Sequence, residues 1–138
     1  MKSLLKIIGV TSALAVSQMT FATAATPALP KGVGPVQSVT LAKVDPAKAS
    51  KGQQLFQSKC TACHQLNQKL VGPALSGVTK RRAPEWILNM ILNPAEMTQK
   101  DPTAKELLAT YKVPMSSTGV TQDEAKLILE YLRQQDGQ

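Results

Sequence analysis

The sequence predicts an all-α domain of about four short helices. Apolar residues recur at helical spacing in several segments after residue 47, and no segment there alternates apolar and polar residues as a half-buried strand does. Typical helix-starting residues precede two of these segments, and prolines bound others. With 138 residues, the chain is long enough for one small domain preceded by additional segments.

The first 24 residues have the pattern of a cleavable secretion signal. Lys2 and Lys6 supply a positive start, residues 4–16 form a short apolar run, and small residues at the end of the segment place cleavage before Ala25. The apolar run is too short and too interrupted to remain as a membrane-spanning helix, so we expect export and no stable membrane insertion. Residues 25–46 are rich in proline and lack periodicity, which predicts an extended or flexible segment draped over the domain.

The first predicted helix begins near Ala47 and runs into a cysteine-containing motif at residues 60–64. Gly52 and Phe56 lie on neighbouring turns of this helix. Residues 66–82 are predicted to be irregular, because glycines and a proline interrupt them.

Three further helices are predicted after the irregular stretch. The first spans residues 84–93 and ends before Pro94. The second opens with Asp101 as N-cap and has a proline at its first helical position. The last begins with Thr121 as N-cap and Glu124 three residues later, a capping box, and continues with apolar residues at amphipathic spacing.

The strongest chemical signal is Cys60-Thr61-Ala62-Cys63-His64, a C-x-x-C-H sequence that is typical of covalent c-type haem attachment. On a helix the two sulfurs lie about one turn apart on one face, so each can form a thioether with a vinyl group on one edge of a porphyrin. His64 can then place its imidazole beneath the metal as the proximal ligand. The motif contains both cysteines and the single histidine of the chain.

Three other interpretations of the motif are weaker. A thioredoxin-like redox pair requires a nearby βαβ pattern, which this sequence lacks. A structural zinc site normally uses four Cys or His ligands, and the chain offers three. A disulfide between Cys60 and Cys63 would leave His64 unexplained. The motif therefore favours one covalently attached, thioether-linked haem c.

Composition supports this interpretation and excludes nucleic-acid binding. Cleavage of the leader removes two lysines, so 14 basic residues stand against 9 acidic ones. The lysines are scattered, and only residues 80–82 form a basic run, which is no nucleic-acid stripe. Aromatic residues make up 4% of the sequence, and a domain of this size has a marginal core. A buried haem would supply the missing apolar volume.

From residue 48 to residue 134 most of the chain resembles the small class I cytochromes c of bacterial periplasms. The matching segments are Gly52-x-x-Leu55-Phe56 before the haem motif, Val71-Gly72-Pro73-x-Leu75-x-Gly77-Val78 after it, and Glu130-Tyr131-Leu132 near the C-terminus. The resemblance implies a cytochrome c fold at residues 47–138, with the helices wrapped around one haem. It also implies that Gly52 and Phe56 contact Tyr131.

The sixth ligand of the iron decides between electron transfer and catalysis. No second histidine exists, so a methionine is the candidate. Met90 lies on the apolar face of a predicted helix, where methionine usually packs in the core. Met97 follows a predicted helix stop and is the second choice as a ligand, and hydrophobic packing is the role favoured for it. Met115 follows Pro114 in a loop before the last helix, and the family places its ligand methionine in such a loop. We therefore expect His64 and Met115 to be the metal ligands.

Supporting residues are also suggested at the haem. The resemblance implies that the carbonyl of Pro73 fixes the tautomer of His64, and an ordinary turn proline is the alternative. Trp86, Arg81 and Arg82 are candidates for donating hydrogen bonds to the haem propionates. The alternatives are core packing for Trp86, with its indole N–H on a polar atom, and a solvated surface position for the two arginines.

These features predict a periplasmic one-electron carrier. Ligation by His and Met raises the reduction potential and leaves no open site for oxygen or peroxide, so we expect no enzyme activity. The expected partners are redox proteins, with a dehydrogenase or membrane complex as donor and a reductase or oxidase as acceptor.

Two other functions remain open, together with the mode of docking. The protein is alternatively a haem-bearing electron-transfer subunit of a multi-subunit oxidoreductase, with residues 25–46 as its docking arm. A haem enzyme or gas sensor with labile methionine ligation is the third candidate. Lysines flank the haem motif and would steer the protein to acidic docking surfaces, although scattered lysines are usually only solvated. These lysines are Lys51, Lys59, Lys69 and Lys80.

Overall fold

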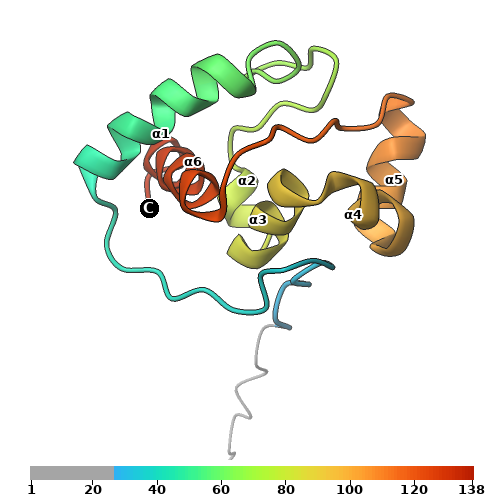
Figure 1. Ribbon diagram of the computed structural model, residues 1–138, viewed down its shortest axis with the longest axis horizontal. Helices are drawn as coiled ribbons and strands as arrows, with labels where there is room; N and C mark the ends of the chain where they lie inside the picture. The colour runs from blue at the N-terminus through green and yellow to red at the C-terminus, as the bar shows by residue number, and fades with distance from the viewer. Residues whose placement is uncertain (1–26) are drawn as a thin grey trace, which may run out of the picture.

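The computed structural model describes residues 27–138, and the predicted leader at residues 1–24 lies outside the described residues. Residues 27–138 are all-α, as predicted, and contain no strand. No helix in this part of the chain combines the length and apolar character needed to cross a membrane. The helices in Figure 1 are α1 (Pro46–Lys59), α2 (Val78–Arg81), α3 (Pro84–Leu92), α4 (Pro94–Lys100), α5 (Pro102–Tyr111) and α6 (Gln122–Gln135).

Two helix starts that the sequence predicts are confirmed. The side chain of Asp101 caps α5 by accepting a hydrogen bond from a backbone N–H of its first turn. Thr121 and Glu124 form the capping box of α6, each side chain accepting a hydrogen bond from the backbone of the other residue. The first helix starts at Pro46, with Asp45 as a side-chain cap. These local signals act within one turn, which is why the sequence alone reveals them.

The helices α2 and α4 lie outside the predicted set. The first falls within the stretch predicted to be irregular, and the second starts at Pro94, which the sequence indicates only as a helix stop. Proline suits the first position of a helix, because the N–H it lacks would have no partner there. Between α3 and α4, Asn93 takes φ −142° and ψ 61° and so turns the chain. The chain therefore bends at Asn93, and Pro94 starts the next helix, α4.

The helices α1 and α6 cross at Gly52, where their backbones touch. A Cβ atom on Gly52 would lie 1.9 Å from the carbonyl oxygen of Leu127, so no larger residue fits. One turn further along α1, the ring of Phe56 packs on Tyr131 with centroids 5.3 Å apart. The contact that the resemblance implies is confirmed. The crossing also fixes where α1 ends, and the cysteine motif starts there.

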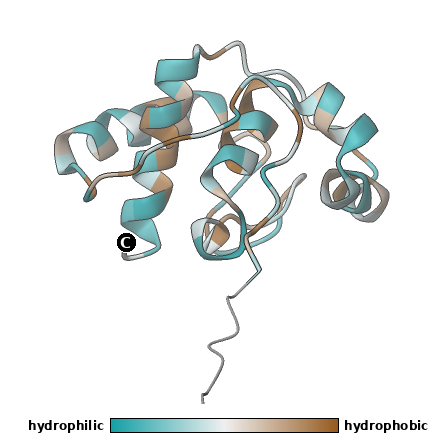
Figure 2. Cartoon of the chain, turned by 90° about the horizontal axis from the view of Figure 1, so that it is seen from below, coloured by the Kyte–Doolittle hydropathy of each residue, from teal (hydrophilic) through white to brown (hydrophobic). Residues whose placement is uncertain are grey.

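The centre of the core is formed by α3. Leu88 is fully buried, and Ile87 and Ile91 are 5% and 8% exposed. Figure 2 shows apolar residues on the inner parts of the helices and hydrophilic residues on their outer parts. One side of α3 faces a cavity that is described below, and another side faces the N-terminal segment.

Residues 27–45, which we call the strap, run without helix or strand along one side of the molecule before they enter α1 (Figure 1). Asn89 of α3 is fully buried and holds the strap with its amide group. Its N–H groups donate to the carbonyl oxygens of Lys31 at 3.2 Å and Val36 at 2.9 Å, and its oxygen accepts from the N–H of Val36 at 2.9 Å. The side chain of Val36 is itself buried in the core. The strap thus contributes to the folded core.

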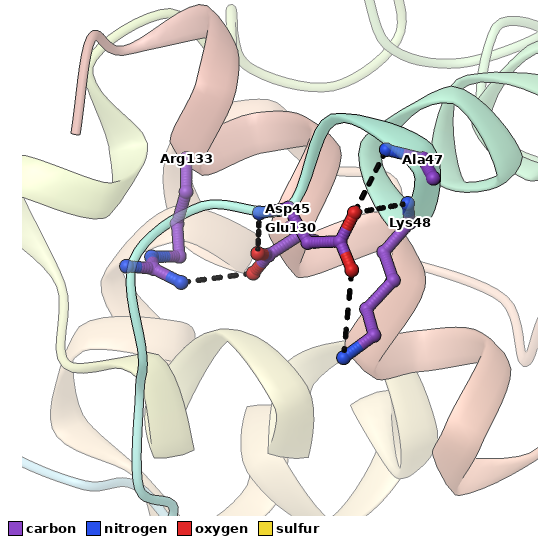
Figure 3. Close-up of polar contacts among 5 residues, drawn as sticks. All are labelled: Asp45, Ala47, Lys48, Glu130 and Arg133. Atoms are coloured by element: carbon purple, nitrogen blue, oxygen red, sulfur yellow. Dashed lines mark hydrogen bonds and ion pairs between the residues drawn. The ribbon is translucent and has the colours of Figure 1, made fainter.

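A buried ion pair on α6 holds the other end of the strap, as Figure 3 shows. Arg133 donates to the carboxylate of Glu130 at 2.8 Å and to the carbonyl oxygen of Ala42 at 2.8 Å. Glu130 also accepts a hydrogen bond from the backbone N–H of Asp45 at 2.7 Å. Asp45 then caps α1, so one network connects α6, the strap and the start of α1.

The C-terminal end of α6 is bound to the start of α2 by Asp136. Its carboxylate accepts hydrogen bonds from the N–H of Gly77 at 2.6 Å and from the N–H and hydroxyl of Thr79 at 2.9 and 2.6 Å. Burial by itself would raise the pKa of Asp136, but hydrogen bonds from Thr79 and Gly77 outweigh it and hold the pKa below its ordinary value.

We predict that Asn89→Leu lowers the free energy of unfolding of the holoprotein by about 3 kcal/mol, because it leaves three backbone groups of the strap without their partner. Denaturant unfolding measures the loss, and limited proteolysis should show faster cleavage within the strap. Ser38→Ala changes an exposed strap residue and should alter stability by less than about 0.5 kcal/mol. An Asn89→Leu protein as stable as the wild type would contradict this account of the strap.

We also predict that Asp136→Asn destabilises the protein in a pH-dependent way. A carboxylate with a lowered pKa in the folded state contributes stability above its unfolded pKa of about 4 and loses that contribution as the pH falls through its folded pKa. The difference in stability between wild type and variant should therefore be largest near neutral pH and shrink in acid. Asp123→Asn, at a largely exposed side chain, should keep the pH profile of the wild type. A difference that stays constant with pH would be inconsistent with this role.

Candidate functional site

The cysteine motif follows directly on the C-terminal end of α1. The N–H of Cys60 donates to the carbonyl oxygen of Phe56, and the N–H of His64 donates to that of Cys60, so the motif continues the helical path as a turn. No disulfide joins the two cysteines; Cys60 is partly buried and Cys63 is exposed. Burial raises the pKa of the Cys60 thiol to about 11. No three His, Cys, Asp or Glu side chains converge as a metal site within residues 27–138.

The ring of His64 is held by the loop that follows it. Its Nδ1 atom lies 3.0 Å from the carbonyl oxygen of Pro73. Since a carbonyl only accepts, Nδ1 carries the proton, and Nε2 keeps the lone pair that a metal requires. A Cβ atom on Gly72 would lie 2.4 Å from the imidazole, so glycine is needed for this close approach. This hydrogen bond is the contact through which the resemblance expects Pro73 to fix the tautomer of His64.

A cavity of about 320 Å³ lies beside the motif and is lined by residues from all six helices, with Thr98 as the single residue from α4. Its wall is mostly apolar and includes Phe56, Leu75, Val78, Ile87, Leu107 and Ile128. Cys60, Cys63 and His64 also lie in this wall. An apolar cavity with two thiols and an imidazole at its edge has the donor set that a covalently bound haem c requires. The residues present therefore fit that group.

Three methionines are candidates for the sixth ligand, and they differ in whether they line the cavity. Met115 and Met90 both line the cavity. Met115 belongs to the segment between α5 and α6, which Figure 1 shows passing across the molecule from one helix to the other. Met97 does not line the cavity; it is fully buried in α4, and its sulfur accepts a hydrogen bond from the N–H of Val33 at 3.1 Å. Met97 is therefore a core residue in contact with the strap, in agreement with the packing role favoured for it from the sequence.

The side chains expected at the haem propionates are largely engaged elsewhere. Trp86 lines the cavity, but its indole N–H donates to Asp101 at 3.0 Å. This contact agrees with the alternative role of Trp86 as a core residue whose indole N–H reaches a polar atom. It links α3 to the N-cap of α5. Arg81 donates to the carbonyl oxygens of Ser76 and Ala74, and Arg82 lies over the ring of Trp86 at 5.3 Å.

Comparison with known proteins gives one consistent result. A family model described as cytochrome c matches residues 49–136. Cytochrome c-551 of Stutzerimonas stutzeri is 32% identical over 95 residues, which cover 64% of this chain and 81% of that protein. Cytochrome c-551 of Ectopseudomonas mendocina is 33% identical over 82 residues, which cover 59% of this chain and 93% of that protein.

Solved structures agree with the sequence matches. Cytochrome c from Rhodothermus marinus superposes with a TM-score of 0.73 at 46% sequence identity, covering 75% of this chain and 90% of that chain. An engineered form of the same protein gives a TM-score of 0.74 at 44% identity, covering 76% of this chain and 92% of that chain. The described part of the chain therefore has the fold of these proteins.

Proposed function

The chain belongs to the cytochrome c family, as a class I protein with one covalently bound haem c, and we propose that it is a periplasmic one-electron carrier with His64 and Met115 as the iron ligands. Small electron-carrying cytochromes are the proteins it matches in sequence and fold. The observation that carries the proposal is the shared cavity wall, which includes both cysteines, the histidine and Met115.

The loop at residues 72–73 prepares His64 for its role. The carbonyl oxygen of Pro73 accepts a hydrogen bond from the Nδ1–H group of His64, which leaves the lone pair of Nε2 for a metal and increases the basicity of the imidazole. The contact with Gly72 restricts rotation of the ring. His64 therefore keeps one orientation when the oxidation state changes.

Met115 is favoured over Met90 by its place in the chain. Met90 stands on α3, next to the fully buried Leu88 and Asn89, so its backbone is fixed by the packed core. Met115 is in a segment without helix or strand, and this segment can adjust the thioether to the distance that coordination requires. The haem supplies Fe(III)/Fe(II) exchange when bound. If His64 and Met115 both hold the iron, the haem would offer no open site to oxygen or peroxide, which supports a carrier over an enzyme.

Export to the periplasm is supported by the leader pattern at residues 1–24. An exposed cysteine pair oxidises readily outside the cytoplasm, and thioether formation at Cys60 and Cys63 removes that liability.

Docking of redox partners is expected at the edge of the cavity. Cys63 is exposed there, and Val71 and Val113, which also line the cavity, are 41% and 52% exposed. The four lysines named above are exposed, and none of them is in an ion pair within residues 27–138. This distribution favours partners with acidic docking surfaces.

A role as a tightly bound subunit receives less support. That alternative used residues 25–46 as a docking arm, but the strap is bound to α3 by Asn89 and to α6 by Arg133. These contacts hold the strap against its own domain, so the strap is not available as a docking arm.

We predict that Met115→Ala abolishes the weak methionine-to-iron absorption near the red end of the ferric visible spectrum, because the thioether ligand is removed. The protein is expressed with its own leader and recovered from the periplasmic fraction, so the same preparation tests its location. Met90→Leu also changes a cavity methionine and should retain the absorption band. If the band survives in Met115→Ala and disappears in Met90→Leu, the proposed ligand is wrong.

We further predict that electron transfer to a negatively charged redox protein slows markedly as ionic strength rises, because charge attraction is screened. Stopped-flow rates at increasing salt measure the effect. Lys59→Gln, at a lysine in the cavity wall, should slow transfer at low salt more than Lys126→Gln, at a lysine already paired with Asp123. Rates independent of salt would argue against docking by charge.

A further inference from the structure

The segment that carries Met115 is weakly held by the rest of the protein. Within residues 27–138, residues 113–120 form no hydrogen bond with other residues. Residues 105–124, from the first turn of α5 to the first turn of α6, also include no buried residue. The N-caps of α5 and α6 fix the two ends of this stretch. Few buried contacts and few hydrogen bonds are typical of a region that opens at a low cost in free energy.

Tyr111 connects this stretch to the loop that holds His64. It is the last residue of α5, four residues before Met115, and it lines the cavity. The ammonium group of Lys69 lies over its ring, with Nζ 5.0 Å from the ring centroid. A cation within about 6 Å of an aromatic centroid is attracted by the ring. The contact therefore ties the end of α5 to the loop after the haem motif.

Backbone hydrogen bonds fix the loop from which Lys69 extends. The N–H of Leu70 donates to the carbonyl oxygen of Gly72 at 3.1 Å, and the N–H of Gly72 donates to that of Cys63 at 2.8 Å. Gly72 is also the residue that packs on the imidazole of His64. Lys69 thus belongs to a fixed part of the molecule, whereas its partner ends a helix whose C-terminal half contains no buried residue.

The contact lies at the mouth of the cavity. Val71 and Val113 follow Lys69 and Tyr111 by two residues each, and both line the cavity while being 41% and 52% exposed. We propose that Lys69 and Tyr111 are positioning residues, whose contact holds the Met115 segment over the cavity and slows the release of Met115 from the iron. This inference rests on the proposed ligation by Met115.

The alternative is that Lys69 is simply solvated and that Tyr111 only packs in the cavity wall. A cation–π contact needs both partners, so loss of either should have nearly the same effect, and loss of both should add little. It also needs a ring and a charge, but neither the phenol hydroxyl nor an ammonium group in particular. An exposed contact of this type is equivalent to a change of about two- to fivefold in a rate.

The experiment measures the binding of imidazole to the oxidised holoprotein by stopped flow, because imidazole replaces the methionine only after the segment moves away. Lys69→Met and Tyr111→Leu should each bind imidazole about two- to fivefold faster than the wild type, and the double variant no faster than the faster single variant. Lys69→Arg and Tyr111→Phe keep the charge and the ring, so they should keep the wild-type rate. Lys105→Met, which removes an exposed charge from α5, should also keep it.

Wild-type rates in both single variants, or effects that add in the double variant, would overturn the proposal. A Tyr111→Phe protein as fast as Tyr111→Leu would also overturn it, because the effect would then belong to the phenol hydroxyl. Met115→Ala, measured beside them, tests the proposed ligand separately: it should lack the methionine-to-iron absorption and bind imidazole faster than any other variant. Survival of that absorption would show that the ligand is wrong, whereas additive effects with the absorption lost would show that only the contact is wrong.

Discussion

The crossing of α1 and α6 at Gly52 is the constraint on which the rest of the structure depends. Because the backbone of α1 touches the carbonyl oxygen of Leu127, the two helices have one relative position. The ring contact between Phe56 and Tyr131 extends that position to the end of α1. Cys60 and His64 follow immediately, so the crossing determines where the attachment site stands relative to the cavity.

Buried hydrogen bonds connect the remaining elements to one another and to the α1–α6 pair, and so position the residues of the cavity wall. The link from Trp86 to Asp101 joins α3 to the cap of α5, and Asp136 binds α2 to the end of α6. The strap covers α3 on a side away from the cavity through Asn89. Each connection uses a buried polar group with all or most of its partners inside the protein. Buried polar groups whose hydrogen bonds are satisfied make the core rigid, so they give the cavity wall a defined shape.

The sequence predicts those features that are encoded locally. The capping box at Thr121, the haem motif and the glycine at the helix crossing depend on residues within one or two turns, or on a family resemblance. The connection between Trp86 and Asp101 depends on how α3 packs against α5, and no local pattern reveals it. Residues of the strap show no periodicity, because their main contacts are backbone groups bound by Asn89. The burial of Met97 follows from the same tertiary contacts.

The central claim, that Met115 completes the coordination opposite His64, is tested most directly by the methyl NMR spectrum of the reduced protein labelled at its methionine methyl groups. A methyl group bound directly over the haem plane experiences a large upfield ring-current shift. The account predicts one such resonance, retained in Met90→Leu and Met97→Leu proteins and absent in Met115→Leu. A shifted resonance that disappears in Met90→Leu, or the lack of any shifted methionine methyl group in the wild type, would contradict it.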